Sequence, residues 1–107
     1  MREKQKCDMR GLLSFQVLWL LSKRPMHGDE IAEEIGKRRG DKPKAGTIYP
    51  ALKELKENGL IKGSKKGKMI TYSLTSEGKG ELKSGVMYLC RSFGDIFQER
   101  GNAGNKA

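Results

Sequence analysis

The sequence predicts an α+β fold that is mostly helical, with three helices, a two-stranded β-wing and a long C-terminal helix. Three observations lead to this prediction. Apolar residues recur at helical spacing in the first half of the chain. Two short stretches then flank a glycine-containing turn, which is typical of a β-hairpin. A final segment repeats apolar residues at alternating intervals of four and three, as in helices that pair. Elements in this order form a winged helix-turn-helix followed by a dimerisation helix.

The 107 residues are expected to form one domain with four parts. These parts are a basic N-terminal arm (1–10), the winged helix domain (11–75), a C-terminal dimerisation helix (76–100) and a disordered tail (101–107). The arm and the tail are polar segments that can bury little surface. The sequence leaves open whether the arm touches a partner or is only a loose terminus.

The first helix is predicted over residues 11–22 and is apolar on almost every side. A helix with this composition is buried on most of its faces. A monomer of this size can hardly surround it, so we expect one flank to meet another subunit. That flank carries Leu12, Phe15 and Trp19.

A second helix is predicted from Asp29 to about Lys37, after a tight connection. Its core-facing residues are Ile31, Ala32 and Ile35. The connection contains His27, the only histidine of the chain. Because His27 has no neighbouring metal ligands in the sequence, it is interpreted as a loop residue and no metal site is predicted.

The third helix lies within residues 44–61 and is strongly amphipathic. One face carries four apolar residues at helical spacing, namely Ile48, Ala51, Leu52 and Leu55. The opposite face is polar and carries Gly46, Pro50, Lys53 and Glu57. Pro50 is expected in the first turn, where its missing N–H costs least. Asn58-Gly59 is expected to end the helix.

Two strands are predicted at Leu60–Ser64 and Met69–Leu74, with a lysine-rich turn at 65–68. In the second strand one face is expected to be buried, with Ile70, Tyr72 and Leu74. The turn carries Lys65, Lys66 and Lys68, which in a winged helix reach a groove or a phosphate. The alternative is a hairpin end that is merely charged.

The last helix is predicted from Ser76 to about Glu99, capped by Thr75. Its glycines should weaken it by about 1 kcal/mol each relative to alanine. A seam of two heptads consists of Leu82, Val86, Leu89, Phe93 and Ile96, broadened by Phe97. We expect this seam to form a two-fold homodimer. The alternative is that it folds back onto its own domain.

The net charge of +9 is concentrated in one region. Residues 36–68 contain 11 lysines and arginines against 3 acidic residues, so the third helix and the wing are strongly basic. A local basic excess of this kind is the footprint of a polyanion partner, and its alternative is a solvated surface that only aids solubility.

No constellation of residues predicts catalysis or a cofactor. The sequence contains no P-loop, no paired carboxylates in an apolar setting, no Ser/His/Asp set and no metal-spaced Cys/His cluster. Cys7 and Cys90 are isolated, no secretory signal is evident, and the longest apolar run is too short to span a bilayer. We therefore expect a cytoplasmic protein with reduced thiols, and not an enzyme.

Three segments resemble the PadR-like family of transcriptional regulators. GTIYPALKELKENGLI (46–61) is similar to the signature helix of that family, and LLSKRPMHGDEI (20–31) and YSLTSEG (72–78) flank it. The resemblance covers residues 11–82 without a large gap. It implies a winged helix-turn-helix, a C-terminal dimerisation helix, and repression by operator binding. The single helix after the wing resembles the shorter subgroup of the family.

The chain departs from the family pattern in three places. Asp29 stands where the family often has an aromatic residue. Met69 and Ile70 stand where basic residues are frequent, and Thr71 stands where a second tyrosine is common. The charge of the wing is concentrated at its turn instead.

The resemblance implies that three residues form the DNA-facing start of the third helix: Thr47, Tyr49 and Pro50. The hydroxyl groups of Thr47 and Tyr49 can donate to phosphate oxygens. Lys53 can reach a base edge or a phosphate, and Lys44 and Lys56 are expected phosphate contacts.

The sequence therefore predicts a sequence-specific DNA-binding transcriptional regulator and favours a homodimeric repressor of a pseudo-palindromic operator. Its expected partners are double-stranded DNA and a second copy of itself. The alternatives are a non-specific architectural DNA-binding protein and a winged-helix protein–protein adaptor.

The sequence leaves open whether an effector regulates the protein. The resemblance implies that a small molecule could bind at the dimer interface, where the aromatic candidates are Phe15, Trp19, Phe93 and Phe97. Plain core packing is the favoured reading of these aromatics. Cys90 could sense oxidation, but a buried, inert thiol is favoured.

Overall fold

The computed structural model describes residues 9–106, and the side chains of residues 12–99. Four helices and three strands follow one another along the chain. The helices are α1 (Met9–Leu21), α2 (Gly28–Arg39), α3 (Ala45–Glu57) and α4 (Ser76–Lys106). The strands are β1 (Met26–His27), β2 (Ile61–Lys66) and β3 (Met69–Leu74). This is the mostly helical α+β architecture predicted from the sequence.

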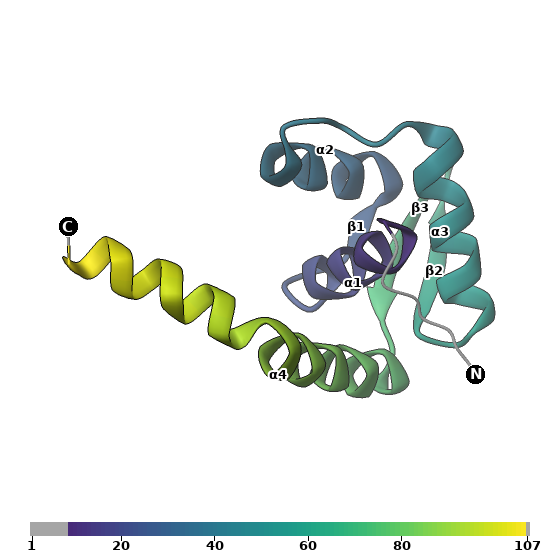
Figure 1. Cartoon of the computed structure of the whole chain (residues 1–107). Coiled ribbons are helices and arrows are strands. Elements are labelled where there is room, and N and C mark those ends of the chain that lie inside the picture. The colour runs from purple at the N-terminus through teal and green to yellow at the C-terminus, as the bar shows by residue number, and fades with distance from the viewer. Residues whose placement is uncertain (1–8, 107) are drawn as a thin grey trace.

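The first three helices pack together beside a small antiparallel sheet, and α4 starts beside α1 and extends away from them toward its C-terminal end (Figure 1). The molecule is elongated, with principal extents of 53 × 31 × 23 Å. Its core is entirely apolar among the described residues and contains Val17 of α1, Ile31 and Ile35 of α2, and Ile48 and Leu52 of α3. Burial of these side chains supplies the main driving force of folding.

The sheet has the order β1-β3-β2. The wing pairs Ile61 with Leu74 at its base and Lys66 with Met69 at its tip. The third strand, β1, was not predicted: the segment expected to be only a tight connection pairs His27 with Thr71. The hairpin turn is shorter than predicted, because Lys65 and Lys66 belong to β2.

Several element boundaries differ from the prediction. Helix α1 begins at Met9, within the segment expected to be an arm, and residues 1–8 lie outside the described part of the chain. Helix α3 begins at Ala45, so Pro50 is its sixth residue and not part of its first turn. Pro50 therefore cannot donate to the carbonyl of Gly46, a bond that an ordinary residue would form. Gly59, at φ 77°, follows the helix end as predicted.

Helix α4 continues to Lys106, through most of the segment predicted to be a disordered tail. The polar, glycine-containing composition of that segment masked its continuity with the preceding helix. The predicted buried face of β3 is also only partly correct. Tyr72 is buried and Leu74 is half-buried, but Ile70 is exposed because it lies beyond the end of the core.

The start of α4 is tied to the α3–β2 corner by hydrogen bonds around Thr75. The hydroxyl of Thr75 accepts the N–H of Gly78 at 3.0 Å and donates to the carbonyl of Gly59 at 2.6 Å. The N–H of Thr75 donates to the carbonyl of Leu60 at 3.1 Å. These bonds confirm the predicted cap and orient α4 relative to the winged helix.

Candidate nucleic-acid interface

Helix α3 presents a polar face because its apolar face is fixed in the core. Ile48, Leu52 and Leu55 are buried, which leaves the opposite side in solvent. All six candidates predicted on this helix and its N-cap are exposed, namely Lys44, Thr47, Tyr49, Pro50, Lys53 and Lys56. The structure therefore gathers these candidates on the accessible side of one helix.

The approach to α3 is set by the end of α2. Gly40 adopts the left-handed conformation at φ 81° and its N–H donates to the carbonyl of Gly36 at 2.7 Å. This closing bond ends α2 and redirects the chain into the loop that leads to Lys44. Lys44 is the N-cap residue of α3, but its side chain forms no capping hydrogen bond with the helix. The backbone N–H groups of Ala45 and Gly46 precede the first N–H donor within the helix, so this end suits an anion.

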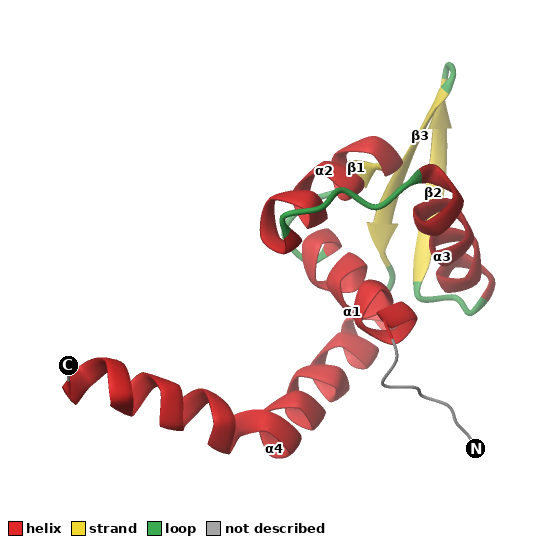
Figure 2. Ribbon diagram, turned by 45° about the horizontal axis from the view of Figure 1, so that its top comes forward, coloured by secondary structure: helices red, strands yellow, loops and turns green. Residues whose placement is uncertain are grey.

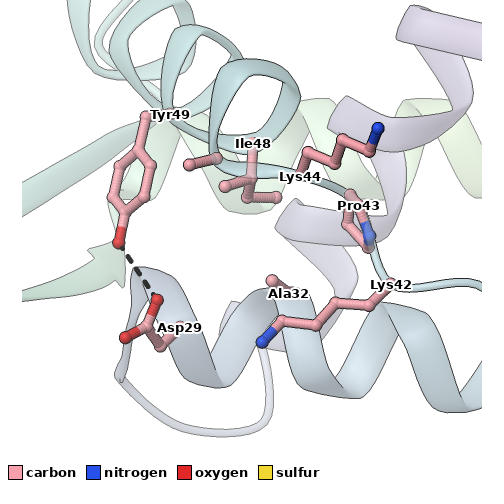
Figure 3. A pocket seen from close by; sticks show the side chains of 8 residues that line it. Asp29, Ala32, Lys42, Pro43, Lys44, Ile48 and Tyr49 are labelled. Carbon is pink, nitrogen blue, oxygen red and sulfur yellow. Dashed lines mark hydrogen bonds between the residues drawn. The ribbon is translucent and has the colours of Figure 1, made fainter.

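Tyr49 lies across the start of α2 and is 42% exposed. Its ring covers Gly28 so closely that a Cβ atom there would lie 2.6 Å from Tyr49 Cε1. Its hydroxyl donates to Oδ1 of Asp29 at 3.4 Å (Figure 3). Burial, and then the negative charge and hydrogen bond of Asp29, raise the pKa of Tyr49. The hydroxyl expected to donate to a phosphate is thus engaged within the protein.

A shallow groove of about 360 Å³ separates the start of α2 from the start of α3. Its floor is apolar, with Ala32 and Ile48, and its rim carries Asp29, Lys42 and Lys44 (Figure 3). Lys42 Nζ lies 3.0 Å from Oε2 of Glu33, and this hydrogen bond raises the pKa of Lys42. Sequence reasoning did not include Asp29 and Lys42 among the site residues, since neither lies on the helix that was expected to contact DNA.

The wing carries the remaining basic candidates at its far end. Lys65, Lys66 and Lys68 are all exposed, and Gly67 forms the turn at φ 61°. The tip of the hairpin projects beyond the helices (Figure 2). Met69, paired with Lys66, is also exposed and adds an apolar side chain to this charged tip.

The predicted dimerisation residues form an incompletely covered apolar surface. Leu82 packs against the core and Leu89 is half-buried, whereas Val86 and Phe93 are exposed. Ile96 and Phe97 are the most exposed of the seam, at 60% and 63%. Within the single chain, Leu82 packs against the core of its own domain, whereas Phe93, Ile96 and Phe97 extend past it and stay exposed.

The candidates on α1 adjoin this seam. Leu12 is exposed, while Phe15 and Trp19 are half-buried. Phe15 touches α4, where a Cβ atom added to Gly85 would lie 2.8 Å from its ring. Trp19 is flanked by Lys23 and Arg38, whose charged groups lie 4.8 and 5.2 Å from the ring centre. Phe15 and Trp19 line a hollow of about 210 Å³, and the lining of this hollow does not include Phe93 or Phe97.

Two further expectations concern cysteine and metal. Cys90 is exposed in the single chain, so its own domain does not bury the thiol, and burial beside the proposed dimer seam stays a prediction. Within residues 9–106, no cluster of three or more His, Cys, Asp or Glu side chains could hold a metal ion. No helix in that range is long and apolar enough to cross a membrane.

Comparison with known proteins connects this geometry to a family. The profile of the transcriptional regulator PadR-like family matches residues 17–84. A protein of Thermoplasma acidophilum assigned as a transcriptional regulator is 32% identical, with a TM-score of 0.66 over 91% of this chain and 98% of its own. A transcriptional regulator of Clostridium thermocellum is 27% identical, with a TM-score of 0.72 over 84% and 94%.

A PadR family transcription regulator of Clostridium difficile is also 27% identical, with a TM-score of 0.70 over 83% of this chain and 97% of its own. No curated protein sequence matches the chain significantly.

Proposed function

The chain belongs to the PadR-like family of transcriptional regulators and is a DNA-binding protein with no enzymatic activity, and we propose that it is a homodimeric repressor of a pseudo-palindromic operator. The observation that carries this proposal is the exposed face of α3, where hydroxyl and ammonium groups stand opposite the buried side chains of Ile48, Leu52 and Leu55. Such a helix can enter the major groove while the core holds it in place.

The start of α3 is the part proposed to read DNA. Thr47 and Tyr49 can supply hydroxyl donors to phosphates, and Pro50 lies between them and Lys53 on the exposed side. Lys53 is proposed to reach a base edge or a phosphate, with Lys44 and Lys56 as phosphate contacts. Glu54 and Glu57 add negative charge to the later turns, so the reading capacity is concentrated in the first two turns.

The wing is proposed to add phosphate or minor-groove contacts. Three exposed lysines at its projecting tip provide the charge for such contacts. Neutralising phosphates releases counterions from DNA, which makes affinity fall steeply with salt. For four or five phosphates per subunit, the log–log salt slope of a dimer should be on the order of −8.

The dimer is proposed to form through α4 and the exposed flank of α1. Leaving Val86, Phe93, Ile96 and Phe97 in water is unfavourable, and a second copy of the same surface would cover them. A two-fold dimer would place two α3 helices in successive major grooves about one helical turn apart. Bound at an operator, it would exclude the transcription machinery from that DNA. Because its target is DNA, we propose that it acts in the cytoplasm.

Selection of bound duplexes from a random library tests this function. We expect the full chain to enrich one motif with two-fold symmetry, and to protect it in a footprint against a large excess of competitor DNA. Enrichment of no motif, with binding to all duplexes equally, would instead show a non-specific architectural protein. Absence of DNA binding at low salt would favour a protein–protein adaptor. Derepression of a reporter on loss of the protein distinguishes a repressor from an activator.

A further inference from the structure

One carboxylate stands among the basic and hydroxyl groups at the start of α3. Asp29 is exposed in the first turn of α2 and lines the same groove as Lys44 and Tyr49. In Figure 3 its carboxylate faces the Tyr49 hydroxyl, which donates to it at 3.4 Å. An acidic group in contact with a proposed phosphate donor opposes the attraction that the surrounding lysines provide.

We infer that Asp29 competes with DNA phosphate for the hydroxyl of Tyr49 and thereby lowers the affinity of the protein for DNA of any sequence. This inference rests on the proposed function, in which Tyr49 contacts the DNA backbone. A phenol has only one O–H to donate. While that donor is given to Asp29, a phosphate oxygen cannot receive it.

The geometry makes the exchange feasible in both directions. The contact at 3.4 Å is longer than the usual O–H···O distance of about 2.7–2.8 Å, so the hydroxyl can leave the carboxylate when an acceptor approaches at a shorter distance. The ring itself is held, because it packs against the backbone of Gly28. Rotation about the Cζ–Oη bond of Tyr49 alone would therefore redirect the donor, without displacement of α2 or α3.

The position of Asp29 on α2 favours phosphate as its competitor over a base edge. In a helix-turn-helix the helix before the recognition helix crosses the DNA backbone. A short aspartate side chain at the start of that helix would meet phosphates before it could reach into the groove. Two like charges about 4 Å apart in water weaken binding about fivefold.

The test is the variant Asp29→Asn, which keeps the shape of the side chain and removes its charge. Affinities are measured by fluorescence anisotropy on the operator duplex obtained by selection and on a scrambled duplex. We expect tighter binding to both duplexes, by about fivefold per subunit. Asp29→Ala, which removes the acceptor as well, should show at least the same gain. Asp41→Asn is the matched control, because it removes the same charge from an exposed position in the next loop and should change little.

A double-mutant comparison isolates the role of Tyr49. In a Tyr49→Phe background, Asp29→Ala, which removes the acceptor, should gain less affinity than in the wild-type chain, since no hydroxyl is released. An equal gain in both backgrounds, an equal gain in Asp41→Asn, or no gain at all would overturn the inference. Weaker binding of Asp29→Asn to the operator alone would make Asp29 a base reader and would also overturn it. Failure of the wild-type chain to bind either duplex would refute the proposed function instead.

Discussion

The packing of Gly78 against the α3–β2 corner leads to a prediction about the attachment of α4. A Cβ atom at this position would overlap the carbonyl oxygen of Leu60 and lie 2.7 Å from Leu74 Cδ1. The carbonyl of Leu60 is backbone and also accepts the N–H of Thr75, so it cannot move aside alone. We therefore expect Gly78→Ala to shift the start of α4.

The magnitude follows from two opposing effects. Overpacking a filled site costs about 1–3 kcal/mol and more when the obstacle is backbone. Alanine in place of glycine inside a helix returns about 1 kcal/mol. The free energy of unfolding of Gly78→Ala should thus fall by about 2 kcal/mol, which lowers the melting temperature by about 8 °C or more in a domain of this size.

Gly80→Ala is the matched control, because nothing lies within 4 Å of a Cβ atom at Gly80. The substitution of Gly80 changes only the helix propensity of this position, so it should stabilise the protein by about 0.5–1 kcal/mol. Urea unfolding followed by circular dichroism measures both variants, at one fixed protein concentration because a dimer is expected. A Gly78→Ala variant as stable as Gly80→Ala would refute the proposed contact between α4 and the corner.

Two further predictions concern the seam and a charged cluster at α2. Phe93→Asp should give a monomer by light scattering, because it buries a charge in the proposed seam. Met87→Asp, at an exposed position outside the seam, should remain dimeric. If both variants were dimers, the seam would be misassigned. The backbone N–H of His27 and then Arg24 hold the pKa of Glu30 below 4.5. Because the folded pKa is lowered, this stabilisation exists above pH 4.5 and is lost as pH falls through the folded pKa. At neutral pH, the Glu30→Gln variant should therefore unfold at a lower urea concentration than the wild-type chain. This difference in urea midpoint should vanish in acid. A difference in midpoint that stayed constant with pH would contradict the stabilising role of the Glu30 carboxylate.

Local patterns in the sequence were sufficient to predict the four helices, the two strands of the wing and the exposed face of α3. The spacing of Ile48, Leu52 and Leu55 fixes which side of that helix is buried, and Asn58-Gly59 marks its end. These patterns depend only on residues that are close in the sequence, so they can be interpreted without knowledge of the tertiary structure.

Contacts between distant segments could not be predicted in this way. Asp29 and Tyr49 are 20 positions apart, and their hydrogen bond depends on how α2 and α3 cross. The glycines of α4 illustrate the same limit of local reasoning. Gly78 and Gly85 were interpreted only as weak helix formers, but each allows a close approach, to Leu60 and to Phe15 respectively. The two-residue strand β1 is too short to leave a periodic pattern.

The central claim, that the start of α3 reads the operator, is tested most directly by operator affinity of Lys53→Ala. Fluorescence anisotropy on the selected operator should show a loss of about 1–3 kcal/mol relative to the wild-type chain, while light scattering shows an unchanged dimer. Lys83→Ala, which removes the same charge from an exposed position on α4, should bind as the wild-type chain does. Equal operator affinity of Lys53→Ala, Lys83→Ala and the wild-type chain would contradict the assignment of α3 as the reading helix.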